Sequence, residues 1–358
     1  MSIDFHYGVI YYLARLAGLP GNDAKTIAHA SQHVNDATTD ETLQFEGGQT
    51  FERFASAHAP FDYRHEVDPI GSQVWTSFHI LPAAEGASEQ EKAICRPNSR
   101  VGQALITNTL QARSQSNALH RLGVALHAYA ATWANQGFSG VVSDNNRIVW
   151  LEADDFPDWM WFSKLTRHIT QAAQARSDLT IDYFSGLGRG AALQFPDLPW
   201  AHWTYTNMAG QTIVRDNLPD YLEAANMVYK VLQAFHAGRE DFMSLPDLPA
   251  EALNSLHVVL ANNKAYDAQT RLDRFSSALV HGMLAGVREA LPRYVDKGPG
   301  SWRAEATGQL DGDDQIRIKP KWSPAFEESD YRKFHDALKA QQHAVVQEIL
   351  PRFGMHLT

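Results

Sequence analysis

The stretch LGVALHAYAATWANQGF, residues 122–138, decides the predicted fold. Apolar residues recur through it at helical spacing, and it ends near Gly137. His127, Ala131 and Asn135 are each four residues apart, so a helix places them along one face. Of these three residues only His127 is a good metal ligand. The stretch therefore predicts a buried helix that retains part of a metal site.

Helical patterns dominate the rest of the chain, and the alternation typical of strands is scarce. We expect a helix over 5–18 and a second from Asn22 or Asp23 to about 36. Further helices are expected over 99–115, 117–136, 160–176, 218–237, 249–262, 268–291 and 328–350. Long irregular segments separate them, over 38–75, 82–98, 139–158, 178–217 and 293–327. Segments of this length inside a compact domain are usually functional, or else wrap over a core that the helices make.

The predicted fold class is therefore mostly α, a multi-helix bundle with long irregular site-forming loops. We expect one helical domain over residues 1–358, in which 293–327 is an irregular excursion before the C-terminal helix.

Composition limits the partners and the cellular location that we expect for this chain. The formal net charge is -10 and no basic stripe is present, which argues against nucleic acid as a partner. The single cysteine, Cys95, cannot form an internal disulfide, which suits a reducing compartment. No secretory signal and no run of about 18 apolar residues is found, so we expect a cytoplasmic protein without a membrane span. Its predicted partner is a small-molecule substrate.

Aspartate and histidine recur in a definite order along the first part of the chain. The residues are Asp4, His6, Asp36, His79 and His127. This order, together with the glycine-led helix, resembles the all-helical superfamily of zinc-dependent phospholipase C and the single-strand-specific nucleases. The resemblance is closer still to an uncharacterised cytoplasmic bacterial branch of that superfamily. The matching stretches are scattered over residues 4–203.

The resemblance implies a cleft for three zinc ions that activate water for phosphoester hydrolysis. Carried over by position, Asp36, His79 and His127 match three ligands of one zinc. His6 matches a ligand of a second zinc, where Asp4 stands in for a processed amino terminus. Ala131 occupies the position of an aspartate that bridges these two metals.

The third zinc of the superfamily has lost most of its ligands in this chain. Asn135 and Arg189 stand where the resemblance implies histidines, and only Asp197 of the three ligands remains. Because zinc sites need three or four protein ligands, we infer that this metal is lost. Arg189 is then expected to pair with Asp197 or to bind an anionic substrate.

These observations predict a metal-dependent, hydrolase-like enzyme with one zinc on Asp36, His79 and His127 and room for a second at Asp4 and His6. A metal-bound water would act on a small, partly apolar anion, with Asn135, Arg189 and Asp197 as the catalytic residues. The same His/His/Asp set suits iron(II), which makes a non-haem oxygenase an alternative. Another is a metal-free descendant that serves as a binding protein or acid–base catalyst, with its former ligands hydrogen-bonded to one another.

Each residue also has a structural interpretation. His127 suits a hydrogen-bonded place in the core, Asp4 suits a helix N-cap, and Arg189 with Asp197 suits a salt bridge. Aromatic residues either cover the core or line an apolar pocket. They are Trp150, Trp159, Trp161, Phe162, Trp200 and Trp203.

Overall fold

The computed structural model describes residues 1–57, 73–154, 188–309 and 319–357. Its helices before residue 140 are η1 (Asp4–Val9), α1 (Ile10–Leu16), α2 (Gly21–His33), η3 (Trp75–His79), α4 (Glu89–Lys92), α5 (Arg100–Gln111) and α6 (Ala118–Ala134). Those after residue 140 are η4 (Asp144–Asn146), η5 (Gly190–Ala192), η6 (Phe195–Asp197), α9 (Asn217–Ala237), α10 (Ala250–Asn262), α11 (Ala268–Val280), α12 (Trp302–Thr307), α13 (Pro324–Glu327), α14 (Asp330–His343), η8 (Ala344–Ile349) and α15 (Leu350–Arg352). The strands are β1 (Thr42–Gln44), β2 (Thr50–Glu52), β3 (Ile148–Ala153), β4 (His202–Asn207) and β5 (Thr212–Asp216).

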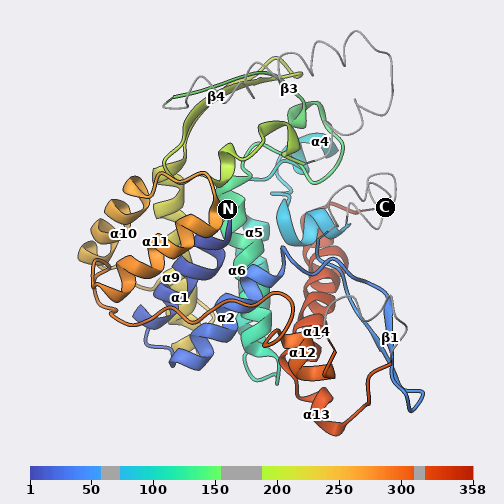
Figure 1. Cartoon of the computed structure of the whole chain (residues 1–358). Coiled ribbons are helices and arrows are strands. Elements are labelled where there is room, and N and C mark those ends of the chain that lie inside the picture. Colours follow the sequence, from blue (N-terminus) through green and yellow to red (C-terminus); the bar gives the residue numbers. More distant parts are fainter. Residues whose placement is uncertain (58–72, 155–187, 310–318, 358) are drawn as a thin grey trace.

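Helix α6 is the centre of the molecule. Figure 1 shows it between the α1–α2 and α9 helices on one side and α14 on the other, and it packs against α2, α5, α9 and α14. Every residue from Leu122 to Ala134 is buried. A helix that is apolar nearly all round belongs in a core, and α6 is covered on every side.

Helices α2 and α6 touch at Gly123. A Cβ atom at this position would lie 2.3 Å from the carbonyl oxygen of Ile27 and 2.6 Å from the Cβ of Ala30. Only glycine therefore allows the two backbones to come so close. One helical turn further along, the same contact brings the Ser31 carbonyl within reach of His127.

The prediction of a mostly α fold is wrong. The described residues form two small antiparallel sheets beside the helices, so the fold is mixed α and β. Strands β1 and β2 form a two-stranded hairpin, and a three-stranded sheet has the order β3-β4-β5. All five strands lie in segments that the sequence pattern assigned to irregular loops.

Several predicted helices are confirmed, and others differ at their ends. The helices expected over 218–237 and 249–262 are α9 and α10. The helix expected over 268–291 ends at Val280, because Gly282 takes a left-handed conformation with φ +71°. The predicted excursion 293–327 contains two short helices, α12 and α13. The predicted helix 160–176 lies outside the described residues.

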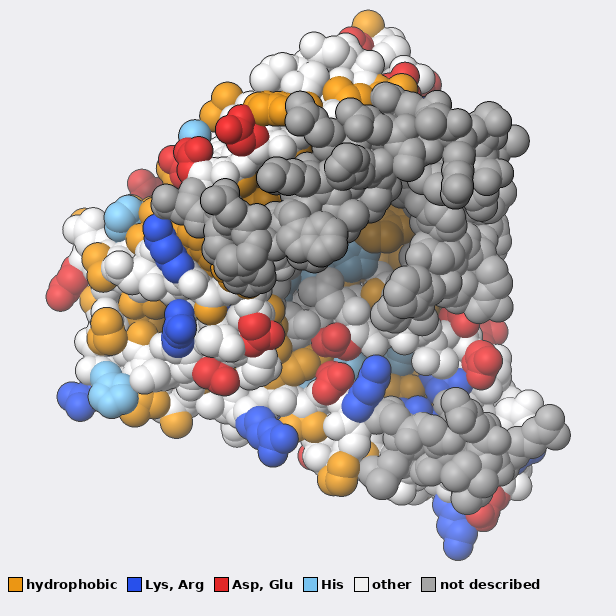
Figure 2. Space-filling model, turned by 45° about the horizontal axis from the view of Figure 1, so that its top comes forward, with side chains coloured by type: hydrophobic (Ala, Val, Ile, Leu, Met, Phe, Trp, Pro, Cys, Tyr) orange, Lys and Arg blue, Asp and Glu red, His pale blue; other side chains and the backbone are white. Residues whose placement is uncertain are grey.

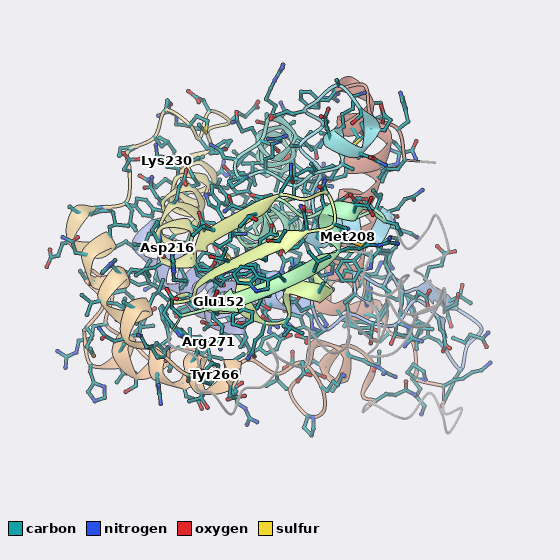
Figure 3. The ribbon with its side chains drawn as sticks, turned by 90° about the horizontal axis from the view of Figure 1, so that it is seen from above. Glu152, Met208, Asp216, Lys230, Tyr266 and Arg271 are labelled. Atoms are coloured by element: carbon teal, nitrogen blue, oxygen red, sulfur yellow. The ribbon has the colours of Figure 1, made fainter. Side chains whose placement is uncertain are left out.

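Apolar packing divides into three regions. The largest surrounds α6 and joins α1, α2, α5, α9, α10 and α11. A second lies between α2, the β1–β2 hairpin, α12 and α14. The third lies under the β3–β5 sheet and contains Phe138, Trp203 and Tyr205. Figure 3, seen from above, shows these strands lying across the helices, with Asp216 where β5 leads into α9.

Within the ranges given above, no helix has both the length and the apolar composition needed to cross a membrane.

Candidate functional site

A cavity of about 340 Å³ lies where η1, η3 and α6 meet the chain around residue 189. Its lining includes six positions singled out in the sequence: His6, His79, His127, Ala131, Asn135 and Arg189. The other lining residues are Met1, Asn35, Ala57, Trp75, Gly190 and Leu193. Figure 2 shows histidine side chains deep in a hollow of the molecular surface. The sequence order thus gathers chemistry-bearing residues from four distant segments into one cavity.

His127 reaches the cavity from the middle of α6. It is 1% exposed, and its Nδ1 donates a hydrogen bond to the Ser31 carbonyl at 2.7 Å. Burial lowers the pKa of His127 well below its usual value, and the neighbouring His6, His79 and amino terminus lower it further. The ring is therefore neutral at pH 7, and with its proton on Nδ1 it carries its lone pair on Nε2.

His6 lies against His127. The two imidazole rings stack with centroids 3.9 Å apart and an interplanar angle of 22°. Burial lowers the pKa of His6 well below its usual value, with added repulsion from the amino terminus, His79 and Arg189. Its Nδ1 is buried and has no hydrogen-bond partner in the described chain. Two neutral imidazoles thus share one side of the cavity.

His79 completes the group from the end of η3. Its ring meets that of His127 edge to face at 5.4 Å, and its Nε2 donates to the Ser56 carbonyl at 2.7 Å. Asn135, at the end of α6, donates Nδ2–H to the carbonyl of His79 at 2.7 Å. This bond ties the η3 segment to α6 beside the cavity.

Arg189 supplies the positive charge of the cavity. Its Nη2 donates to both carboxylate oxygens of Asp197, at 2.8 and 3.0 Å. Asp197 does not line the cavity; it also pairs with the Met1 amino group at 2.6 Å. Burial alone would raise the pKa of the Asp197 carboxyl, but Arg189 and the amino group outweigh it and hold that pKa well below the usual range. The contacts of Asp197 are therefore those of a salt-bridge partner, which is the structural interpretation given above.

Asp4 points away from His6. Its buried carboxylate accepts from Nε of Arg271 at 3.0 Å, a side chain that also donates to the carbonyls of Ala265 and Tyr266. Figure 3 places Arg271 and Tyr266 beside the β3–β5 sheet. Residues two apart in a helix face nearly opposite sides. The structure therefore does not bring Asp4 and His6 together as ligands of one metal ion.

Asp36 also lies off the cavity. Its carboxylate accepts hydrogen bonds from the Tyr294 hydroxyl and, at 3.1 Å, from Nε2 of Gln32. The neighbouring Asn35 lines the cavity in its place. The carboxylate of the predicted Asp36, His79 and His127 set is thus directed elsewhere.

The predicted metal ligands do not fit an ion as arranged. In the described ranges, no group of three or more His, Cys, Asp or Glu side chains is placed to hold a metal. The described lining of the cavity contains no carboxylate, which the predicted iron(II) site would need. In the structure, the carboxylates of Asp4 and Asp36 thus lie apart from the imidazoles with which the sequence analysis grouped them as metal ligands.

Sequence reasoning missed the apolar side of the cavity. Trp75 and Leu193 line it, and the sequence analysis gave neither of them a role. Trp203 is 1% exposed in the core under the sheet, Trp150 is 39% exposed, and Trp200 packs against Tyr266; none of the three lines the cavity. The predicted aromatics at 159, 161 and 162 lie outside the described residues.

Comparison with known proteins gives one match. The model of a family of unknown function, DUF6765, matches residues 1–349. The chain belongs to the DUF6765 family. No curated protein and no solved structure matches it. The matched residues of this DUF6765 member include the whole described lining of the cavity, so the family model covers the candidate site.

Proposed function

We propose that this DUF6765 protein is an enzyme that binds a small, partly apolar anion in the cavity and acts on it by acid–base chemistry. One observation carries the proposal. His127 donates Nδ1–H to the Ser31 carbonyl at 2.7 Å, so its neutral ring offers the Nε2 lone pair on the cavity side. A lone pair held in a fixed position is what a general base requires.

Arg189 supports binding of an anion. Both of its hydrogen bonds to Asp197 use Nη2, so Nε and Nη1 remain to donate to a ligand. A guanidinium with two free donors suits a carboxylate or another planar anion. Trp75, Ala131 and Leu193 give the cavity an apolar wall for the rest of the molecule.

Substrate binding and base strength are coupled in this arrangement. Without an anion at Arg189, the low pKa of His127 makes it a weak base. An anion at Arg189 would place a negative charge near the ring and raise that pKa. His127 would then take a proton from the substrate, or from a water that attacks it, onto Nε2. His127 thus becomes an effective base only beside its substrate.

A metal-dependent hydrolase is the second candidate, and one observation favours it. His79 and His127 each donate a ring N–H to a main-chain carbonyl at 2.7 Å, which is how proteins orient histidines that bind zinc through the other nitrogen. The resemblance to the phospholipase C and nuclease superfamily belongs to this candidate. It needs a further ligand that the described cavity does not supply as arranged.

The test is nuclear magnetic resonance of the imidazole nitrogens in protein labelled with ¹⁵N-histidine, with signals assigned by His127→Gln. We expect His127 to be neutral at pH 5.5, with its proton on Nδ1. Benzoate is the anion probe, and zinc is added to a separate sample. Benzoate should move the Nε2 signal and raise the pKa of His127. Arg189→Gln should abolish this effect, and the exposed control Arg352→Gln should keep it.

The outcomes separate the two candidates. A proton on Nε2, an ordinary titration of His127 near pH 6.5, or no response to benzoate contradicts the acid–base proposal. A stoichiometric shift of the His79 and His127 signals at one equivalent of zinc favours the hydrolase instead.

A further inference from the structure

Asn135 lines the cavity and has an acceptor without a partner in the described chain. The side chain is 3% exposed, and its Nδ2 donates to the His79 carbonyl. Because a carbonyl can only accept, this bond fixes the amide orientation and identifies the other atom as Oδ1. Oδ1 is buried and has no hydrogen-bond partner in the described chain. A buried acceptor without a partner costs free energy unless a ligand or water supplies the donor.

His6 presents a second such acceptor. Its Nδ1 is buried and has no hydrogen-bond partner in the described chain, and the neutral ring carries one lone pair on one of its two nitrogens. Together with His127, three side chains that line the cavity thus have an acceptor without a partner in the described chain, and Arg189 is the one charged side chain of its described lining that can donate.

We infer that the ligand of this cavity carries two groups, an anion for Arg189 and a neutral hydrogen-bond donor, a hydroxyl or an amide N–H, for Asn135, His6 and His127. The inference rests on the proposed function and deepens it, because it names the substrate class: hydroxy acids or acylated amino acids with an apolar substituent. The apolar part would lie against Trp75 and Leu193.

Charge decides between a neutral donor and an ammonium group. Burial is the main reason that the pKa of His6 is low, and the amino terminus and Arg189 also disfavour a positive charge on its ring. An ammonium group there would meet the same repulsion. A hydroxyl or amide N–H satisfies the acceptors without adding charge. The proposed substrate class therefore excludes amino acids with a free ammonium group.

The experiment compares four probes of similar size by calorimetric titration of the full chain. Mandelate has a carboxylate, a phenyl ring and a hydroxyl; phenylacetate lacks the hydroxyl. O-methylmandelate keeps the oxygen but not the donor, and phenylglycine carries an ammonium group. We expect mandelate to bind at least about tenfold more tightly than each of the others, because each leaves the acceptors unpaired or adds a charge.

A variant assigns the preference to a residue. Asn135→Leu keeps the size of the side chain and removes Oδ1, so the preference for mandelate over phenylacetate should fall by about threefold or more. Thr107→Val, on α5 away from the cavity, is the control and should keep the wild-type ratio. The ratio in wild-type protein remains the main readout if Asn135→Leu does not fold.

The two proposals fail in different ways. Equal affinity for mandelate and phenylacetate, with both lost in Arg189→Gln, overturns the donor inference and leaves anion binding intact. Tighter binding of phenylglycine than of mandelate also overturns it. No binding by any of the four probes contradicts the anion site itself, and with it both proposals.

Discussion

At the scale of single residues, Asp197 holds the cationic side of the cavity in place. It pairs with Arg189 and with the Met1 amino group, and its side chain is about one-fifth exposed at 21%. A carboxylate in this position balances one of two neighbouring positive charges. The remaining charge is available to an anionic ligand, which links the stability of this corner to the charge of the cavity.

Asp197→Asn should therefore weaken both the fold and the site. An amide keeps the shape but leaves two cations facing each other, and we expect a loss of about 1–3 kcal/mol in the free energy of unfolding. Urea unfolding at pH 7 measures this loss. Asp247→Asn breaks the pair of Lys230 with the exposed carboxylate of Asp247 and should cost less than about 1 kcal/mol. Equal losses in the two variants would contradict the role given to Asp197.

At the scale of elements, the approach of α2 to α6 positions the proposed base. Gly123 and His127 are one turn apart on α6, and both face α2, where they meet Ile27 and Ser31. The distance between the two helices therefore sets the hydrogen bond that fixes the tautomer of His127. A substitution of Gly123, which itself carries no reactive group, should therefore alter the hydrogen bond of His127 in the cavity.

Gly123→Ala tests this link. The new Cβ would overlap the Ile27 carbonyl, and overpacking of this kind costs about 1–3 kcal/mol, only partly offset by the better helix propensity of alanine. We expect a lower free energy of unfolding and a changed Nδ1 signal of His127. Gly102→Ala on α5 is the control, because its Cβ would meet side chains rather than backbone, the Tyr129 ring at 3.3 Å and the Ser99 Oγ at 3.6 Å. An unchanged His127 signal in a destabilised Gly123→Ala protein would contradict the prediction, because it would show that this helix contact does not set the hydrogen bond of His127.

The ends of the elements explain what the sequence could and could not predict. His127, Ala131 and Asn135 were placed correctly on one side of the cavity, because a helix repeats its face every four residues. Asp36 was not, because α2 ends at His33 and the turn that follows directs Asn35, rather than Asp36, to the cavity. The spacing of residues along the sequence does not predict where their side chains point beyond the end of a helix.

The strands escaped prediction for a different reason. β1 and β2 have three residues each, too few for alternation to be distinguished from a loop. β4 does alternate, with Trp203 and Tyr205 buried, but a single strand of this length gains meaning only beside its partners. Gly210, with φ +78° between β4 and β5, was the local signal of a hairpin.

At the scale of the whole molecule, buried neutral histidines join separate parts of the fold. His29 of α2 stacks on Trp302 of α12 with centroids 3.9 Å apart. His335 of α14 is 4% exposed and bonds through Nδ1 to the backbone of Phe54. Burial lowers the pKa of His29 to about 2 and that of His335 to about 3. Both rings must stay neutral for these elements to remain packed.

Stability should therefore fall in mild acid. The unfolded chain protonates each histidine below about pH 6.5, whereas the folded chain does not until about pH 3 or lower, so stability is fully present above pH 6.5 and is lost as the pH falls. Each group contributes up to about 1.4 kcal/mol per pH unit. Urea unfolding should show about 2 kcal/mol more loss between pH 6 and 5 in the wild type than in a His29→Phe, His335→Phe double variant. His257→Phe, at an exposed position, is the control and should follow the wild type. An equal loss in the double variant would mean that other groups take up the protons that drive acid unfolding.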